Sequence, residues 1–146
     1  MSNCEERVCG ICLIQEGMLE LARGIALAEE AIREFKDCRF CEGVRLCERA
    51  IREMEAGLAK LELGLDNFEL DRCARKEVAD IICHIKECIK CIREALEAIC
   101  RGDVENGICM LEKAVCFIKK DLAKLNDLIG VDRHCRRDKC RCNNRR

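Results

Sequence analysis

Cysteine is unusually frequent in this sequence, with 16 among 146 residues. A thiolate can act as a nucleophile, bind a soft metal ion or form half of a disulfide, so three kinds of chemistry are open. Short chains this rich in Cys are usually disulfide scaffolds with a small core. A chain of this length can bury an ordinary core without such support. The thiols are therefore expected to serve a purpose other than holding the fold together.

Metal binding is one such purpose. His84, Cys88 and Cys91 are spaced to share one helix edge, where they could face Cys47 across a helix bundle and complete a set of four soft ligands. The simpler alternative is that Cys88 is a small packing residue and His84 an ordinary polar residue beside the core. Thiolate pairs that suit Zn(II), Cu(I) or an iron–sulfur cluster occur at 9/12, 38/41, 88/91 and 140/142.

Catalysis is not expected. A nucleophilic Cys needs a base and an orienting partner, and the only histidines, His84 and His134, have no recognisable catalytic context. A thioredoxin-type Cys-x-x-Cys belongs after a strand, and no strand is predicted. The Glu-x-x-His of di-iron bundles does not occur. The protein is predicted not to be an enzyme and to need no cofactor, with Cu(I) or Zn as the alternative.

An internal duplication indicates which elements position these residues. The stretch GVRLCERAIREMEAGLAKLELGL at 43–65 recurs sixty-four residues later as GICMLEKAVCFIKKDLAKLNDLI at 107–129. The same offset carries Cys9 onto Cys73 and Ile25 onto Ile89. A helix that recurs with its neighbours indicates a helical hairpin, present twice.

Apolar residues recur every three or four positions in four segments, which predicts four helices joined by short turns. Gly102 is expected to cap the third helix, Asp103 to begin the fourth and Gly130 to end it. The predicted fold is all-α, an antiparallel up-down four-helix bundle made from the duplicated hairpin. The expected helices span about 8–35, 40–65, 74–100 and 104–129.

The predicted domain organisation is a bundle followed by a tail. The tail is basic, lacks an apolar period and is expected to be disordered on its own, so bonds through its three cysteines are candidates for fixing it. The expected bounds are 1–130 for the bundle, about 8–66 and 73–130 for its hairpins, and 131–146 for the tail.

Small residues mark a tight seam in the first hairpin. Gly costs a helix about 1 kcal/mol relative to Ala, so rows of Gly at steps of seven indicate helices that approach closely. Such rows contain Gly10, Gly17, Gly24 and Ala31, and then Gly43, Ala50, Gly57 and Gly64.

In an up-down bundle most of the cysteines fall near one of its two ends, which suits cross-linking. Cys9 and Cys73 are equivalent in the duplication and are the first choice for an internal bridge, if their α-carbons lie about 4.4–6.8 Å apart. The cross-link candidates are Cys4, Cys9, Cys12, Cys38, Cys41, Cys73, Cys100, Cys109, Cys135, Cys140 and Cys142.

Composition excludes several classes of partner. The 27 Lys and Arg balance 28 Asp and Glu, and Trp and Tyr are absent, so nucleic-acid binding is not expected. No stretch approaches the about 18–20 apolar residues of a membrane span. The N-terminus does not follow the pattern of an export signal, so synthesis in a reducing cytoplasm is expected. Met110 and Phe117 leave the inward row of the fourth helix and are predicted to form a lateral contact with another chain, or else to widen the core.

Two resemblances follow from these features. A cysteine-loaded four-helix bundle without an export signal resembles the bacterial copper storage proteins, whose interior thiols hold Cu(I); here most inward positions are aliphatic, and only Cys47 and Cys88 point inward. A small cysteine-rich chain with a basic, cysteine-bearing tail also resembles the coat and exosporium proteins of bacterial endospores, which implies cross-linking into the outer layers of the spore.

The favoured hypothesis is a structural protein that associates with itself and is fixed by disulfides into an array or filament, as in the outer layer of a spore. The alternative is a cytosolic thiolate protein that binds or stores Cu(I) or Zn. An adaptor whose basic tail binds an acidic partner is a third hypothesis.

Overall fold

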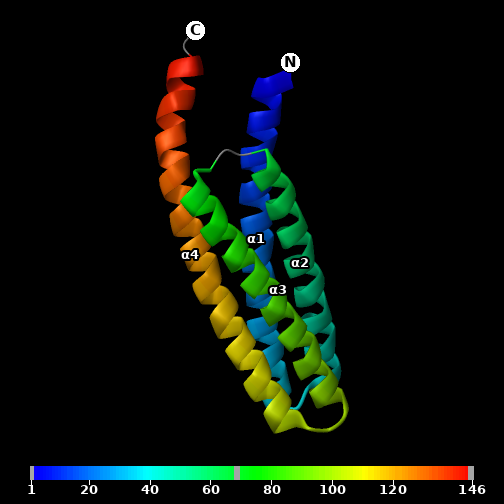
Figure 1. Ribbon diagram of the computed structural model, residues 1–146. Helices are drawn as coiled ribbons and strands as arrows, with labels where there is room; N and C mark the ends of the chain where they lie inside the picture. The colour runs from blue at the N-terminus through cyan, green and yellow to red at the C-terminus, as the bar shows by residue number, and fades with distance from the viewer. Residues whose placement is uncertain (1, 68–69, 145–146) are drawn as a thin grey trace.

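The computed structural model consists of four helices that lie side by side (Figure 1). It describes the backbone at residues 2–67 and 70–144, and the side chains at 10–67 and 70–129. Within these ranges there is no strand, and the predictions of an all-helical protein and of four helices that pair as a bundle are confirmed. The helices are α1 (Ser2–Lys36), α2 (Phe40–Asp66), α3 (Arg72–Cys100) and α4 (Val104–Asn144).

The two short turns, at 37–39 and 101–103, lie at one end of the molecule and both ends of the chain lie at the other (Figure 1). Ion pairs follow this order. Lys86 binds Glu62 at 2.8 Å and Arg93 binds Glu55, so residues further along α3 meet residues earlier in α2. The elements that lie next to each other in sequence therefore also lie next to each other in the bundle.

The core between the helices is aliphatic. The apolar residues that recur every three or four positions face inward, and Leu21, Leu61, Ile85 and Leu125 are completely buried. Burying each such side chain stabilises the fold by about 1.5–3 kcal/mol. Among the residues whose side chains are described, two of the buried core positions are Cys, namely Cys47 and Cys88.

Glycines bring α1 and α2 into backbone contact. A Cβ placed on Gly57 would lie 2.6 Å from the carbonyl oxygen of Gly17, and one on Gly64 would lie 2.7 Å from that of Gly10. Neither distance leaves room for a methyl group. The glycine rows of the sequence therefore mark the seam of the first hairpin, at the cost in helix propensity that glycine carries.

The two short turns repeat the same backbone pattern sixty-four residues apart. The amide of Arg39 donates to the carbonyl of Glu34 at 2.8 Å, and that of Asp103 donates to the carbonyl of Ala98 at 2.9 Å. Each turn has one residue of positive φ, Cys38 at 64° in the first and Gly102 at 98° in the second. This is the Schellman arrangement that ends a helix, and Gly102 caps the third helix as the sequence predicts.

Helix α4 does not end at Gly130, so the predicted end is wrong. It continues to Asn144, and α1 begins at Ser2 rather than near Val8. The segment after Gly130, expected to be irregular, thus has a helical backbone. A single glycine costs a helix only about 1 kcal/mol, and no proline follows that would stop it. In the part of the chain that the structure describes, no helix combines the length and apolarity needed to cross a membrane.

Candidate functional site

Most of the described thiols lie on the surface. All eleven are free, and only Cys47 and Cys88 are buried. The exposed ones occupy all four helices and the first turn, so they can reach other molecules without any unfolding. They are Cys12, Cys38, Cys41, Cys73, Cys83, Cys91, Cys100, Cys109 and Cys116.

Exposed cysteines lie near both ends of the bundle. Cys38, Cys41, Cys100 and Cys109 flank the two short turns, whereas Cys73 begins α3 near the termini. The predicted bridge between Cys9 and Cys73 is only half described, because Cys73 has a free thiol and the side chain of Cys9 lies outside the described residues. The other candidates whose side chains lie outside them are Cys4, Cys135, Cys140 and Cys142.

The two buried thiols have raised pKa values and low reactivity. Burial raises the pKa of Cys47 to about 12, with smaller contributions from Glu48 and Cys100. Burial also raises the pKa of Cys88 to about 11, and the nearby carboxylate of Asp121 acts in the same direction. At neutral pH both are protonated, and a protonated thiol is a poor nucleophile.

A His–Cys–Asp cluster lies between α3 and α4. The ligand atoms of His84, Cys88 and Asp121 all lie within 4.8 Å of one another. His84 Nδ1 and Asp121 Oδ2 form a short hydrogen bond, and the rings of Phe117 and His84 pack in a T-shaped arrangement with their centroids 5.7 Å apart. The cluster extends from the core to the surface, because the Asp121 side chain is 8 % exposed and the His84 side chain is 48 % exposed.

Asp121 was not among the predicted site residues, although the sequence contains a signal for it. It lies three residues after Ile118 and four before Leu125, both of which face the core. Among the described residues it is the one charged residue that is buried. A carboxylate at an inward position is costly unless it has a partner, and here the partner is His84.

The predicted set of four metal ligands is not assembled. The Cys47 thiol lies close enough to Cys100 for the two to interact electrostatically. Cys100 is twelve residues beyond Cys88, or about 18 Å along the helix at 1.5 Å per residue. Cys91 interacts with Cys88 but is exposed and does not belong to the cluster. His84 and Cys88 thus come together as predicted, and Asp121 takes the place expected of Cys47.

The cluster has the residue types of a cysteine-protease triad but not the electrostatics. A catalytic Cys requires a lowered pKa and access for its substrate. Cys88 is 5 % exposed, and its pKa is raised. The chemistry that these residues support best is coordination of a metal ion, which displaces the thiol proton itself.

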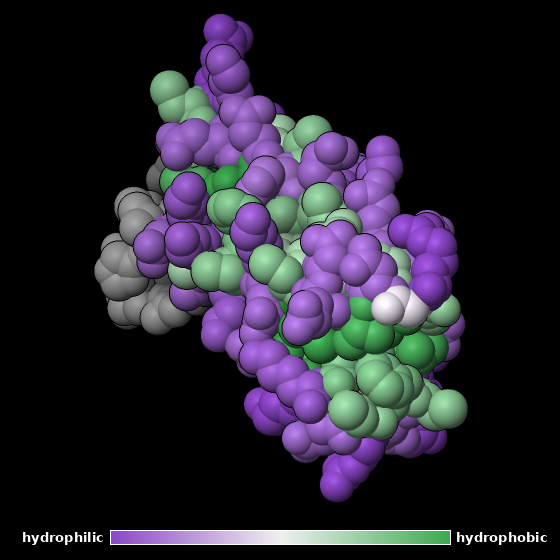
Figure 2. All heavy atoms as spheres, turned by 90° about the horizontal axis from the view of Figure 1, so that it is seen from below, coloured by the Kyte–Doolittle hydropathy of each residue, from purple (hydrophilic) through white to green (hydrophobic). Residues whose placement is uncertain are grey.

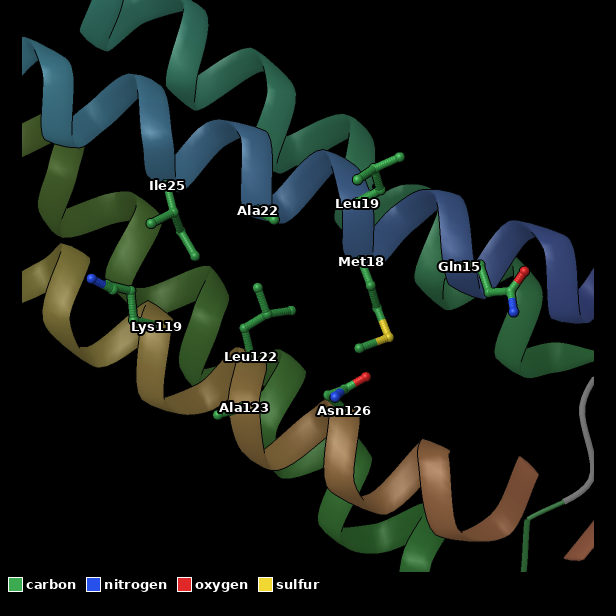
Figure 3. Close-up of a pocket in the computed structure, with 9 residues that line it drawn as sticks. All are labelled: Gln15, Met18, Leu19, Ala22, Ile25, Lys119, Leu122, Ala123 and Asn126. Carbon is green, nitrogen blue, oxygen red and sulfur yellow. The ribbon is translucent and has the colours of Figure 1, made fainter. Parts of the chain in front are cut away.

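An apolar groove runs between α1 and α4 on the outside of the bundle (Figure 3). Leu19 at its edge is 52 % exposed. Lys119 closes one end and binds Glu29 at 2.8 Å. The residues that line the groove are Gln15, Met18, Leu19, Ala22, Ile25, Lys119, Leu122, Ala123 and Asn126.

Hydrophobic residues are also exposed elsewhere. Viewed from the end with the two turns, hydrophobic patches are exposed between hydrophilic residues (Figure 2). Of the two residues predicted to form a lateral contact, Phe117 is 48 % exposed, whereas Met110 is partly buried and packs against the core. Comparison of the chain with protein-family models, curated proteins and solved structures finds no match.

Proposed function

We propose that this protein is a structural component that associates with copies of itself and is then cross-linked through surface disulfides. The observation that carries this proposal is that the residues of the core and most of the thiols occupy different parts of the molecule. The core is aliphatic, whereas nine of the eleven described thiols are exposed. Thiols that contribute little to the core are available for bonds between molecules.

The proposed building block is an antiparallel up-down bundle of two equivalent hairpins, with its cysteine-bearing termini at one end. Exposed cysteines near both ends allow one rod to be joined to the next in a filament or array. Cys83 and Cys116, on the shaft, would join rods side by side. Each bridge releases two electrons and two protons to an oxidant, so cross-linking needs an oxidising setting. The resemblance to coat and exosporium proteins implies that this cross-linking takes place in the outer layers of an endospore.

The groove between α1 and α4 supports association before cross-linking. Leu19 and Met18 present apolar surface there, and exposed apolar surface commonly marks a contact site. Contacts of this kind would place thiols of neighbouring molecules at defined positions. Disulfide geometry tolerates only a narrow range of α-carbon separations, so such positioning would select which cysteines pair.

A store for many Cu(I) ions is supported less well. Such a store needs several thiolates around a shared interior, because Cu(I) prefers soft sulfur ligands. The two buried cysteines, Cys47 and Cys88, lie about 18 Å apart along the bundle. The surface thiols are spread over four helices.

The test is electrophoresis of the full chain before and after incubation with oxidised glutathione. Non-reducing gels are expected to show a ladder of dimers, trimers and larger species that collapses to monomer with dithiothreitol. Replacing Cys38, Cys41, Cys100 and Cys109 by Ser should shorten the ladder, whereas Cys47→Ala, which removes a buried thiol, should leave it unchanged. Monomer alone after oxidation, or an equal ladder from every variant, would overturn the proposal.

A further inference from the structure

We propose that His84, Cys88 and Asp121 bind one divalent metal ion of borderline softness, such as Zn²⁺, in the seam between α3 and α4. This inference is independent of cross-linking, since it uses the buried Cys88 rather than the exposed thiols. It also differs from a many-ion copper store, because it places a single ion at a single position.

The geometry is close to that of a bound ion. His84 and Cys88 are one helical turn apart on α3, so their side chains lie on the same face, and Asp121 reaches them from α4. Bonds of about 2.0–2.3 Å in a tetrahedral site place ligand atoms about 3.3–3.8 Å apart. The three ligand atoms here lie within 4.8 Å of one another, so small side-chain movements suffice to enclose an ion.

The burial of Asp121 points to the same conclusion. The Asp121 side chain is only 8 % exposed, so its carboxylate has lost most of its hydration, and a single hydrogen-bonded histidine restores only part of that free energy. A dication would compensate the negative charges of the Asp121 carboxylate and the Cys88 thiolate together. The thiol proton displaced from Cys88 would pass to solvent, which reaches the site beside the half-exposed His84.

The first hairpin shows what this seam looks like without a site. In the sixty-four-residue repeat, Cys88 is equivalent to Gly24 of the first hairpin, and Asp121 is equivalent to Gly57. A Cβ on Gly24 would lie 2.5 Å from Met54 Cγ, and one on Gly57 would lie 2.6 Å from a backbone oxygen. The first hairpin therefore has no space for side chains where the second has two ligands. The duplication predicts one ion per chain rather than two.

The ligand types indicate the class of ion. One thiolate, one imidazole and one carboxylate suit Zn²⁺ and similar divalent transition metals better than Cu(I), which prefers sulfur, or Mg²⁺, which prefers oxygen. Three protein ligands leave a fourth position for water on the exposed side of His84. Phe117 packs on the imidazole and limits its rotation, which favours a fixed ligand direction.

The test is a titration of the reduced full chain with Co²⁺ under anaerobic conditions. We expect one tight equivalent with the strong visible bands of tetrahedral Co²⁺ and a thiolate charge-transfer band, both lost when Zn²⁺ is added. His84→Ala, Cys88→Ser and Asp121→Asn should each weaken binding at least tenfold. Asp121→Asn retains the side-chain shape, so its helical content and melting curve show whether the fold is intact.

Matched controls separate this site from binding by other thiols. Cys83→Ser and Cys116→Ser remove exposed thiols near the cluster on the same two helices and should leave the tight equivalent unchanged. The chain has only two histidines, so the imidazole nitrogen resonances of His84 can be followed directly by NMR and should shift on addition of Zn²⁺. Equal Co²⁺ affinity in all variants, or His84 resonances that do not respond to Zn²⁺, would overturn the proposal.

Discussion

At the scale of single residues, Cys38 has a backbone conformation that costs free energy for any residue other than glycine. Its φ of 64° lies in the left-handed region, and the equivalent residue of the second hairpin is Gly102, with φ 98°. Left-handed backbone costs an L-residue about 1–2 kcal/mol, a cost that glycine does not incur. The first turn therefore carries strain that the second avoids, and the residue that carries it bears an exposed thiol.

Cys38→Gly is expected to raise the free energy of unfolding by about 0.5–1 kcal/mol, because relief of the left-handed strain exceeds the added flexibility of the unfolded chain. Cys38→Ala should leave stability nearly unchanged, since it keeps the strain. Urea unfolding of the reduced protein measures both. Gly102→Ala is the matched control and should lower stability. If Cys38→Gly proves no more stable than Cys38→Ala, the strain does not contribute.

The His84–Asp121 pair also shows how one residue changes the interpretation of its neighbours. His84 by itself is an exposed polar side chain, and Cys88 by itself is a buried packing residue. A buried carboxylate within 4.8 Å of both turns them into a set with the chemistry of metal ligands. The two interpretations of Cys88, as a packing residue and as a metal ligand, are thus compatible, because a small buried side chain can also be a ligand.

At the scale of the elements, the two hairpins use the same pattern of turns but different seams. The first is closed by glycine, with the carbonyl oxygen of Gly17 lying where a side chain on Gly57 would be. In the second, five of the six corresponding positions carry side chains, namely Ala74, Ile81, Cys88, Asp121 and Leu128. One duplicated element thereby provides a close-packed half and a half that can carry ligands.

Gly57→Ala is expected to destabilise the protein by about 1–3 kcal/mol, because its Cβ would lie 2.6 Å from the Gly17 oxygen and would force α1 and α2 apart. Helix propensity alone predicts the opposite, a gain of about 1 kcal/mol. Ala59→Gly, at an exposed position of α2, is the control and should cost about 1 kcal/mol through propensity. A stabilised Gly57→Ala protein in thermal unfolding would show that the seam can open without cost.

At the scale of the whole molecule, the bundle offers apolar surface that its own helices do not cover. The α1–α4 groove, with the half-exposed Leu19 at its edge, is the surface that best supports association of the protein before any thiol is oxidised. Ion pairs such as Lys119 with Glu29 hold the two helices beside it in register. Contact through the groove and cross-linking through the thiols are separable by experiment.

Leu19→Arg is expected to shift the reduced protein toward monomer, because a charged side chain at the edge of the groove would have to lose its hydration on contact. Sedimentation velocity in the presence of a reductant measures this without interference from disulfides. Leu63→Arg, at a similarly exposed position on α2, provides the comparison and should have little effect. An unchanged sedimentation profile for Leu19→Arg would place the contact elsewhere on the surface.

The local features of this protein follow from its sequence, since they depend on neighbouring residues. Apolar spacing predicts the four helices, and the sixty-four-residue repeat predicts a hairpin that occurs twice, whose two turns prove to share one hydrogen-bond pattern. The same reasoning fails at Gly130, because a glycine weakens a helix without ending it when nothing else competes for the backbone.

Only the tertiary structure decided which side chains meet across helices. The axial position of one helix against the next depends on how all of their side chains pack. A shift of two or three helical turns between them cannot be predicted from the sequence of either helix alone. That shift brings Cys47 to the level of Cys100 and leaves Cys88 with Asp121. His84 and Cys88 could thus be predicted from the sequence as neighbours, whereas the packing of α2, α3 and α4 placed Asp121 rather than Cys47 beside them.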